Sequence, residues 1–150
     1  MDIKKIKFLR EQTGVSISDC REALDQNGND IKKASLWLKE QGIKKAAKKS
    51  DRSTSQGVVE TYVHGGGKIG VLVELLCETD FVAKTQEYKQ LAHEIAMQIS
   101  AMKPKDVKAL LKQEYIRDPQ MTIEDLIKST IAKLGENIQV KRFYRLELGE

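Results

Sequence analysis

The chain has 150 residues, which suits one domain or a small module attached to a modest one. Its 40% hydrophobic and 32% charged residues are typical of a globular protein, and no apolar run reaches the roughly 18 residues of a membrane helix. The formal net charge of +4 permits contact with RNA or an acidic protein surface but selects neither. The amino terminus lacks the apolar core of a secretory signal. Two distant cysteines, Cys20 and Cys77, suit a reducing cytoplasm.

Residues 1–43 are predicted to form a three-helix module with a small core. Ser16 is a candidate N-cap with Asp19 three residues later, and Asp30 can cap the next helix. Gly42 is the expected left-handed stop of the third helix. So few apolar residues indicate a module of marginal stability on its own.

Residues 44–56 are predicted to be a basic, exposed linker because they include no large apolar side chain. The Ala-Lys half favours helix, whereas the Ser/Thr half does not. Lysine-rich segments also occur in RNA-binding proteins, but no aromatic residue interrupts this one for base stacking. The favoured interpretation is a solvated connector, with RNA contact as the alternative.

Residues 57–150 are predicted to be an α+β domain, in which a three-stranded antiparallel sheet carries helices on one face. Apolar residues alternate from Val59 to Val63 and from Ile69 to Cys77, and Gly65–Gly67 mark a hairpin between them. A long amphipathic helix is expected to begin near Thr85 or Gln86 and to end near Pro104.

The remainder of this domain is less regular. Residues 105–120 suggest only another turn or two of helix, and Thr122 with Asp125 predicts a capping box that opens a helix ended by Gly135. The final strand is expected to place Tyr144 and Leu146 on the same face as its first apolar residues, although Phe143 opposite them suggests a bulge.

No catalytic constellation is recognisable. Cys20 and Cys77 lie on apolar stripes and read as buried structural thiols, and His64 and His93 have no ligand-type neighbours at metal-binding spacing. Gly65–Gly67 join two strands, whereas a P-loop joins a strand to a helix. We therefore expect neither an enzyme nor a bound cofactor or metal.

The segment from Thr79 to Ala83 stands out, since it lies between the best strand and the longest helix. Phe81 is a large apolar residue in what should be an exposed connection, and Asp80 beside it needs a partner if it is buried. Either Asp80 caps a first turn and Phe81 folds under the sheet, or the two form a protruding wedge. Exposed aromatic anchors of the second kind are common interface hot spots.

Three blocks of sequence decide between these interpretations. Residues 78–84 (ETDFVAK) resemble the signature of the elongation factor Ts family. So do residues 9–24, with LREQTG followed by DCREAL, and residues 131–149, with IAKLGENI leading to RFYRLELG. The three blocks in this order make the resemblance specific, and it covers nearly the whole chain.

The resemblance implies a ubiquitin-associated-like amino-terminal module, a linker and a dimerisation-type α+β core. It implies guanine-nucleotide exchange on elongation factor Tu in the cytoplasm, with Asp80 and Phe81 near the Mg²⁺ site of that GTPase and Thr79, Val82 and Ala83 completing the contact segment. The amino-terminal module would bind the same partner.

In that module, matching to the family places Lys7, Arg10 and Ile17 on the partner-binding surface. Ser18 stands there where the family commonly has methionine. A larger departure lies in the middle of the chain. The resemblance implies that many members carry a second core subdomain after the long helix. Here only about twenty residues separate that helix from the one opening at Thr122, so this subdomain is missing. Short members pair two chains, so a homodimer is expected. A ubiquitin-type adaptor remains a third possibility, although fold alone does not carry that function.

Overall fold

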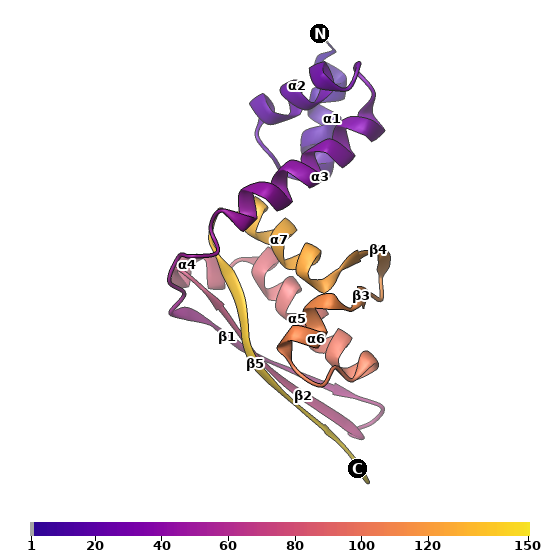
Figure 1. The fold of residues 1–150 in the computed structure, drawn as a ribbon, viewed down its shortest axis with the longest axis vertical. Helices are drawn as coiled ribbons and strands as arrows, with labels where there is room; N and C mark the ends of the chain where they lie inside the picture. Colours follow the sequence, from indigo (N-terminus) through magenta and orange to yellow (C-terminus); the bar gives the residue numbers. More distant parts are fainter. Residues whose placement is uncertain (1) are drawn as a thin grey trace.

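The computed structural model describes residues 2–150 and has an elongated shape (Figure 1). Three helices form the amino-terminal end: α1 (Ile3–Thr13), α2 (Ile17–Gln26) and α3 (Ile31–Ala47). A three-stranded sheet follows, made of β1 (Gln56–His64), β2 (Ile69–Cys77) and β5 (Ile138–Glu147). The remaining elements are α4 (Asp80–Ala83), α5 (Gln86–Met102), α6 (Val107–Lys112), β3 (Glu114–Tyr115), β4 (Asp118–Thr122) and α7 (Ile123–Leu134). The predicted α+β architecture is confirmed.

The amino-terminal helices begin and end largely where their caps predict. Ser16 accepts a hydrogen bond from the Asp19 amide and Asp30 accepts one from the Lys33 amide, so both N-caps are confirmed. A small core closes between the helices, formed by Ile6, Leu9, Cys20, Ala23, Leu24, Ala34 and Leu38. It is separate from the larger core under the sheet.

The prediction that Gly42 ends the third helix is wrong, because α3 continues to Ala47. The residues after Gly42 are good helix formers, and the glycine itself allows a close helix crossing. A Cβ atom at Gly42 would lie 3.1 Å from Cβ of Ala132 in α7. Ala46 is buried in the larger core while Lys44, Lys45 and Ala47 are exposed, so the first part of the expected linker is a helical turn with one packed residue.

The sheet is antiparallel in the order β1-β2-β5. Its inner face presents Val71, Val73, Leu75 and Cys77, all buried, to the helices. Helix α5 lies against this face, with its N-cap at Thr85 as predicted, and its Tyr88 hydroxyl donates to the backbone oxygen of Leu75. Among the described residues no helix is long and apolar enough to cross a membrane.

The expectation for the last strand is half right. The register between β2 and β5 shifts next to Glu74, where Arg142 is its partner while Leu75 already pairs with Val140. This bulge reverses the orientation of every later side chain. Phe143 therefore packs on the core, whereas Tyr144 and Leu146 lie on the outer face and are 63% and 75% exposed.

The segment between α5 and α7 contains a short hairpin that the sequence did not predict. The expected helix is present as α6, but β3 and β4 follow it. Two buried polar side chains of α5 hold this hairpin. Glu94 accepts from the Tyr115 hydroxyl at 2.7 Å and pairs with Arg117 at 2.8 Å, and Gln98 bonds the backbone of residues 114 and 116.

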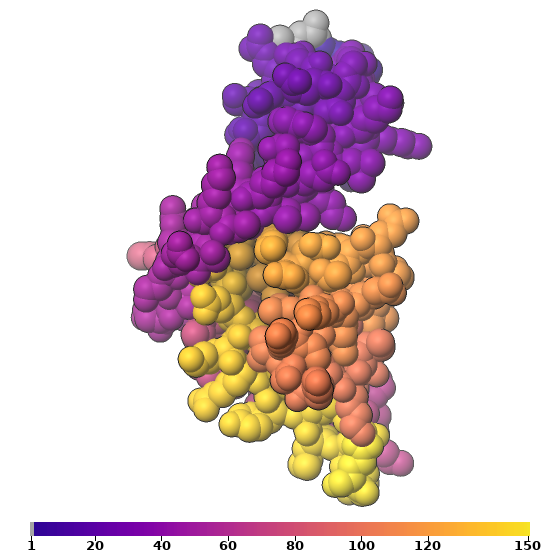
Figure 2. Space-filling view, in the orientation of Figure 1, coloured from indigo at the N-terminus to yellow at the C-terminus, as the bar shows by residue number. Residues whose placement is uncertain are grey.

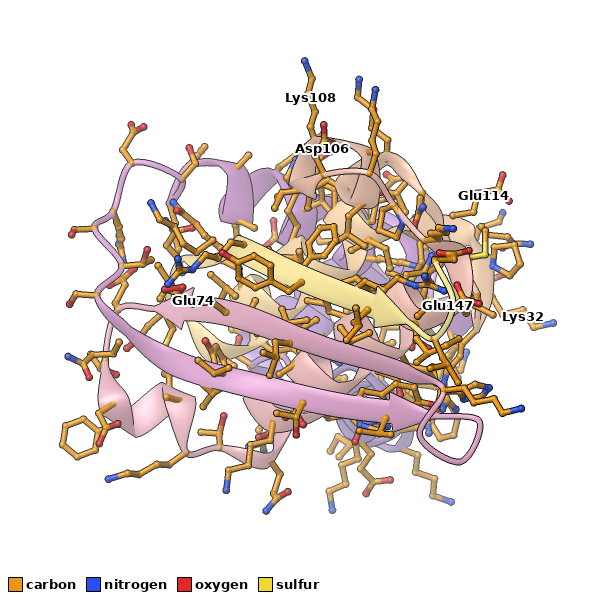
Figure 3. The ribbon with its side chains drawn as sticks, turned by 90° about the horizontal axis from the view of Figure 1, so that it is seen from below. Lys32, Glu74, Asp106, Lys108, Glu114 and Glu147 are labelled. Carbon is orange, nitrogen blue, oxygen red and sulfur yellow. The ribbon has the colours of Figure 1, made fainter. Side chains whose placement is uncertain are left out.

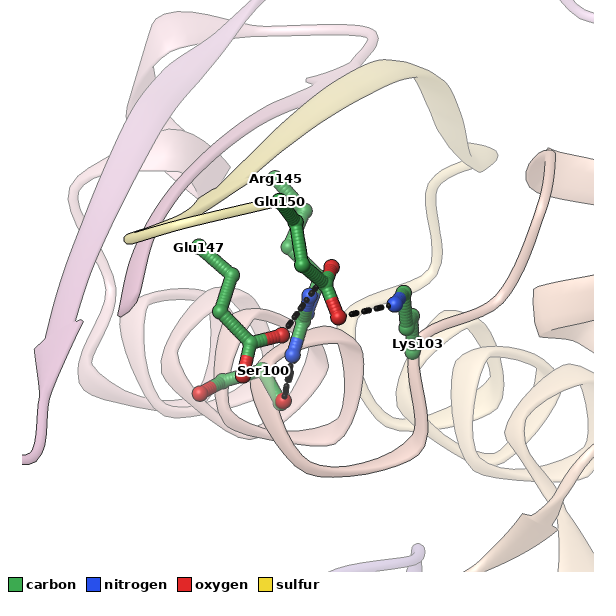
Figure 4. Close-up of polar contacts among 5 residues, drawn as sticks. All are labelled: Ser100, Lys103, Arg145, Glu147 and Glu150. Carbon is green, nitrogen blue, oxygen red and sulfur yellow. Dashed lines mark hydrogen bonds and ion pairs between the residues drawn. The ribbon is translucent and has the colours of Figure 1, made fainter. Parts of the chain in front are cut away.

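The carboxyl terminus is fixed to the end of α5 (Figure 4). Arg145 donates to the backbone oxygen of Ser100 at 3.1 Å and pairs with Glu147 at 2.9 Å. Lys103 bonds Glu150 at 2.6 Å, which lowers the pKa of that carboxyl below its ordinary value. The far end of β5 is thus held against the helical layer.

Candidate functional site

The segment that the sequence singled out forms α4, a single helical turn between β2 and α5. Its N-cap is Thr79, whose hydroxyl accepts from the Val82 amide at 3.4 Å. Phe81 points away from the core and is 87% exposed. The alternative in which Asp80 caps the turn and Phe81 folds under the sheet is therefore wrong.

Asp80 is also exposed, and its carboxylate pairs with Lys84 one turn later at 2.7 Å. The hydrogen bond and charge of Asp80 raise the pKa of Lys84 above its ordinary value. Exposed i,i+4 pairs of this kind contribute little stability. The carboxylate can accordingly exchange Lys84 for another cation at small cost.

The other half of the turn fixes it to the domain. Ala83 is buried and Val82 packs partly against the core. The Thr85 hydroxyl donates to the backbone oxygen of Val82 at 2.7 Å and accepts from the amide of Tyr88, which joins α4 to the start of α5. The segment thus has two sides: Val82 and Ala83 face inward, and Asp80 and Phe81 face solvent.

Residues of the α7–β5 turn contact the base of this segment. Glu136 and Asn137 belong to the third block of the family resemblance, but nothing in that block indicates which residues they contact. Glu136 accepts from the Thr79 amide at 2.9 Å and from the Thr79 hydroxyl at 2.7 Å. The neighbouring Asn137 amide donates to Glu78 at 2.8 Å. These pairs lie 57 and 59 residues apart along the chain, a separation that no periodicity reveals.

The predicted residues of the amino-terminal module lie elsewhere. Lys7 and Arg10 are on α1, and Ile17 and Ser18 begin α2; all four are exposed. Helix α3 runs from this end of the molecule to the sheet, so these residues are not brought together with α4 (Figure 1). A hollow of about 280 Å³ lies beside the contact of the module with α7, and the residues that line it include Gln12, Leu36 and Ser129 (Figure 2).

The remaining candidates for chemistry are structural. Cys20 and Cys77 are buried as predicted, and burial raises the pKa of both thiols. His64 is exposed beside the Tyr62 hydroxyl at 3.0 Å, and His93 is half-buried with its ring edge-on to Tyr62. Within residues 2–150 no group of three or more His, Cys, Asp or Glu side chains is placed to hold a metal ion.

Within the described residues 2–150, no helix covers the outer face of the sheet (Figure 3). Large apolar side chains from all three strands are exposed on it: Val59, Val63, Leu72, Tyr144 and Leu146. The strand register places Leu72 directly beside Tyr144. Because isolated exposed apolar residues are common but a contiguous group is not, this face has the character of an interaction surface.

Two family models match the chain. The model described as "Elongation factor Ts, mitochondrial, N-terminal" matches residues 2–46, and the model described as "Elongation factor TS" matches residues 78–150. The second match contains the whole of α4, and the first covers the three-helix module. The chain belongs to the elongation factor Ts family.

Named relatives agree with this assignment. An elongation factor Ts of Rippkaea orientalis is 44% identical over an alignment that covers 98% of this chain and 78% of the relative. One of Coprothermobacter proteolyticus is 42% identical, covering 97% of this chain and 96% of the relative. One of Methylacidiphilum infernorum is 39% identical and covers 100% and 96%.

As a member of the elongation factor Ts family, the chain is a translation elongation factor. It is also a short one. The alignment with the Coprothermobacter relative spans 190 positions, whereas this chain has 150 residues. The relative therefore carries residues that face gaps in this chain, even though it is itself almost fully covered.

Proposed function

We propose that the chain is a guanine-nucleotide exchange factor that promotes release of GDP from elongation factor Tu in the cytoplasm. The observation that carries the proposal is Phe81, an aromatic side chain 87% exposed on a one-turn helix inside a family signature. An apolar side chain in that position gains nothing from the fold of its own chain. It gains only when a partner covers it.

The proposed action is a wedge formed by Asp80 and Phe81. In a GTPase, Mg²⁺ bridges the phosphates of the nucleotide to a P-loop hydroxyl, so displacing its ligands removes a large share of the nucleotide affinity. Phe81 supplies bulk for this displacement, and Asp80 supplies a carboxylate that competes for cations or donors near the phosphates. Thr79, Val82 and Ala83 hold the wedge on its turn.

No bond is broken in this process, and the chain is not an enzyme in the chemical sense. Exchange follows from thermodynamic coupling: a factor that binds nucleotide-free elongation factor Tu more tightly must lower the GTPase's nucleotide affinity by the same factor. This role requires no acid–base or nucleophilic chemistry, since binding energy alone performs the work.

The amino-terminal module supplies the second attachment. Lys7 and Arg10 offer charge, and Ile17, 55% exposed, offers an apolar contact beside the smaller Ser18. The domain division of 1–43, 44–56 and 57–150 serves this two-point binding. Helix α3 crosses the expected boundary at residue 43, so the module is joined to the core by a helix rather than a loose segment.

The chain acts as a homodimer through the outer face of the sheet. This face is apolar across all three strands, and a second copy would cover it symmetrically. Light scattering at micromolar concentrations tests the assembly. We expect a dimer for the native chain and a monomer for Leu72→Glu, whereas a native monomer contradicts this part of the proposal.

The exchange function is tested by release of fluorescent GDP from elongation factor Tu. The native chain should accelerate release in a concentration-dependent manner, and Phe81→Ala should abolish most of the acceleration. Ile116→Ala is the matched control, because Ile116 is also a large exposed apolar residue but lies on the β3–β4 hairpin. Equal acceleration by native chain and Phe81→Ala would exclude the wedge.

A further inference from the structure

Glu136 contacts Thr79, the residue that directly precedes the wedge in the two-residue connection between β2 and α4. Its Oε1 accepts from the backbone amide of Thr79 at 2.9 Å and its Oε2 accepts from the Thr79 hydroxyl at 2.7 Å. Hydrogen bonds to an ionised carboxylate are stronger than neutral ones, and two at once also fix direction. Thr79 is therefore held in both position and rotamer.

Asn137 connects the same turn to the segment that follows α3. Its side-chain amide donates to the backbone oxygens of Ser50 at 3.3 Å and Arg52 at 2.8 Å, and it is 2% exposed. Its backbone amide donates to Glu78, which also faces Arg52 at 3.7 Å. Glu78, just before the wedge, and residues 50–52, just after α3, are thus both bound by Asn137.

The turn that carries Glu136 and Asn137 lies between two packed elements, α7 and β5. Helix α7 ends at Leu134, the C-cap Gly135 reverses the chain with a φ of 77°, and β5 begins at Ile138, which is buried. Helix α7 packs closely on α3 where Gly42 meets Ala132. Because both flanking elements are packed, Glu136 and Asn137 can hold the residues that they contact, Thr79 and residues 50–52, in fixed positions.

The wedge needs such support because α4 is only four residues long. One helical turn has no stability of its own, since nucleation costs more than a single turn returns. Phe81 is exposed and adds no packing in the free protein. The direction in which Asp80 and Phe81 point is consequently set by Val82 and Ala83 below and by Thr79 at the base.

We infer that Glu136 and Asn137 are positioning residues for nucleotide exchange, which hold the wedge in a fixed orientation relative to the amino-terminal module. This inference rests on the proposed exchange function. Glu136 acts through Thr79 and does not contact the GTPase nucleotide. Asn137 fixes residues 50–52, so that both attachment points meet one GTPase together rather than in succession.

The test measures GDP release against factor concentration for Glu136→Ala. A misplaced wedge lowers the maximal rate at saturating factor, and we expect a loss of at least about tenfold, the factor equivalent to ~1.4 kcal/mol, from two charge-assisted bonds. Partial unfolding would instead raise the half-saturating concentration and leave the maximal rate unchanged. Glu124→Ala is the control, since Glu124 is a glutamate on α7, the helix that precedes Glu136, and pairs with Lys128 at 3.5 Å.

Amide hydrogen exchange gives a readout that does not depend on the GTPase. In Glu136→Ala the amides of Thr79 and Val82 should exchange faster, while those of α5 stay protected. Glu136→Gln keeps the side-chain length and one carbonyl acceptor for the Thr79 amide, so it should restore part of the maximal rate. It also serves as the test variant if the alanine variant does not fold.

The outcomes separate the inference from the function on which it rests. If the native chain does not accelerate GDP release, the exchange function is wrong and the positioning role falls with it. If the native chain is active but Glu136→Ala and Glu136→Gln keep its full maximal rate, only the positioning role is overturned. Unchanged protection of Thr79 and Val82 in a folded variant would also overturn it.

Discussion

Truncation of Phe81 should leave the stability of the protein almost unchanged. The side chain is 87% exposed, so folding removes only about 30 Å² of its surface from water, worth about 0.7 kcal/mol at most. Phe143→Ala is the matched control, because Phe143 packs against the larger core. Truncation of this partly buried phenylalanine should cost about 2 kcal/mol, below the cost at a fully buried site, since a cavity adds to the transfer term.

Urea unfolding followed by far-ultraviolet circular dichroism at 25 °C measures both variants. The single tryptophan is unsuitable as the only probe, because Trp37 packs on the small amino-terminal core and reports that module. We expect a midpoint for Phe81→Ala close to the native value and a clearly lower one for Phe143→Ala. A loss of 2 kcal/mol in Phe81→Ala would show that Phe81 packs in the core and would refute the wedge.

Three further predictions concern other parts of the chain. Gly42→Val should lower the free energy of unfolding by about 1 kcal/mol, since overpacking against Ala132 outweighs the helix propensity gained, whereas Gly70→Val, with open space around it, should not. Both thiols should react slowly with a disulfide reagent at pH 8 in the native protein and quickly in urea, because burial raises their pKa and denies access. A titration with unstructured RNA over a salt series should show only weak binding; tight, steeply salt-dependent binding without faster GDP release would favour the RNA interpretation.

Local signals in the sequence located most of the elements. Ser16, Asp30, Thr85 and Thr122 are N-caps in the structure, and each is readable because a cap bonds amides two or three residues ahead. The exposed Phe81 was one of two interpretations until the family resemblance favoured it. Physical reasoning alone left these alternatives equal, since a short connection can turn an aromatic side chain either way.

The features that were predicted wrongly or not at all depend on contacts between segments that are distant in the sequence. In the sequence Gly42 is typical of a helix end, but in the structure it lies within α3 and its missing side chain allows the close approach of Ala132 in α7. Tyr144 and Leu146 were assigned to the wrong face of β5, because the bulge next to Arg142 reverses the inward and outward alternation of the side chains that follow it. The Glu136–Thr79 bonds could not be anticipated either, because each residue is ordinary in its own neighbourhood.

The affinity of the chain for elongation factor Tu with and without GDP tests the central claim most directly. If the chain promotes exchange by coupling, it must bind the nucleotide-free GTPase more tightly than the GDP-bound form, and saturating GDP must displace it. Calorimetric titrations of both forms should give dissociation constants that differ by the same factor by which the chain weakens GDP binding. Equal constants for the two forms would contradict the account, because a factor without preference shifts no equilibrium.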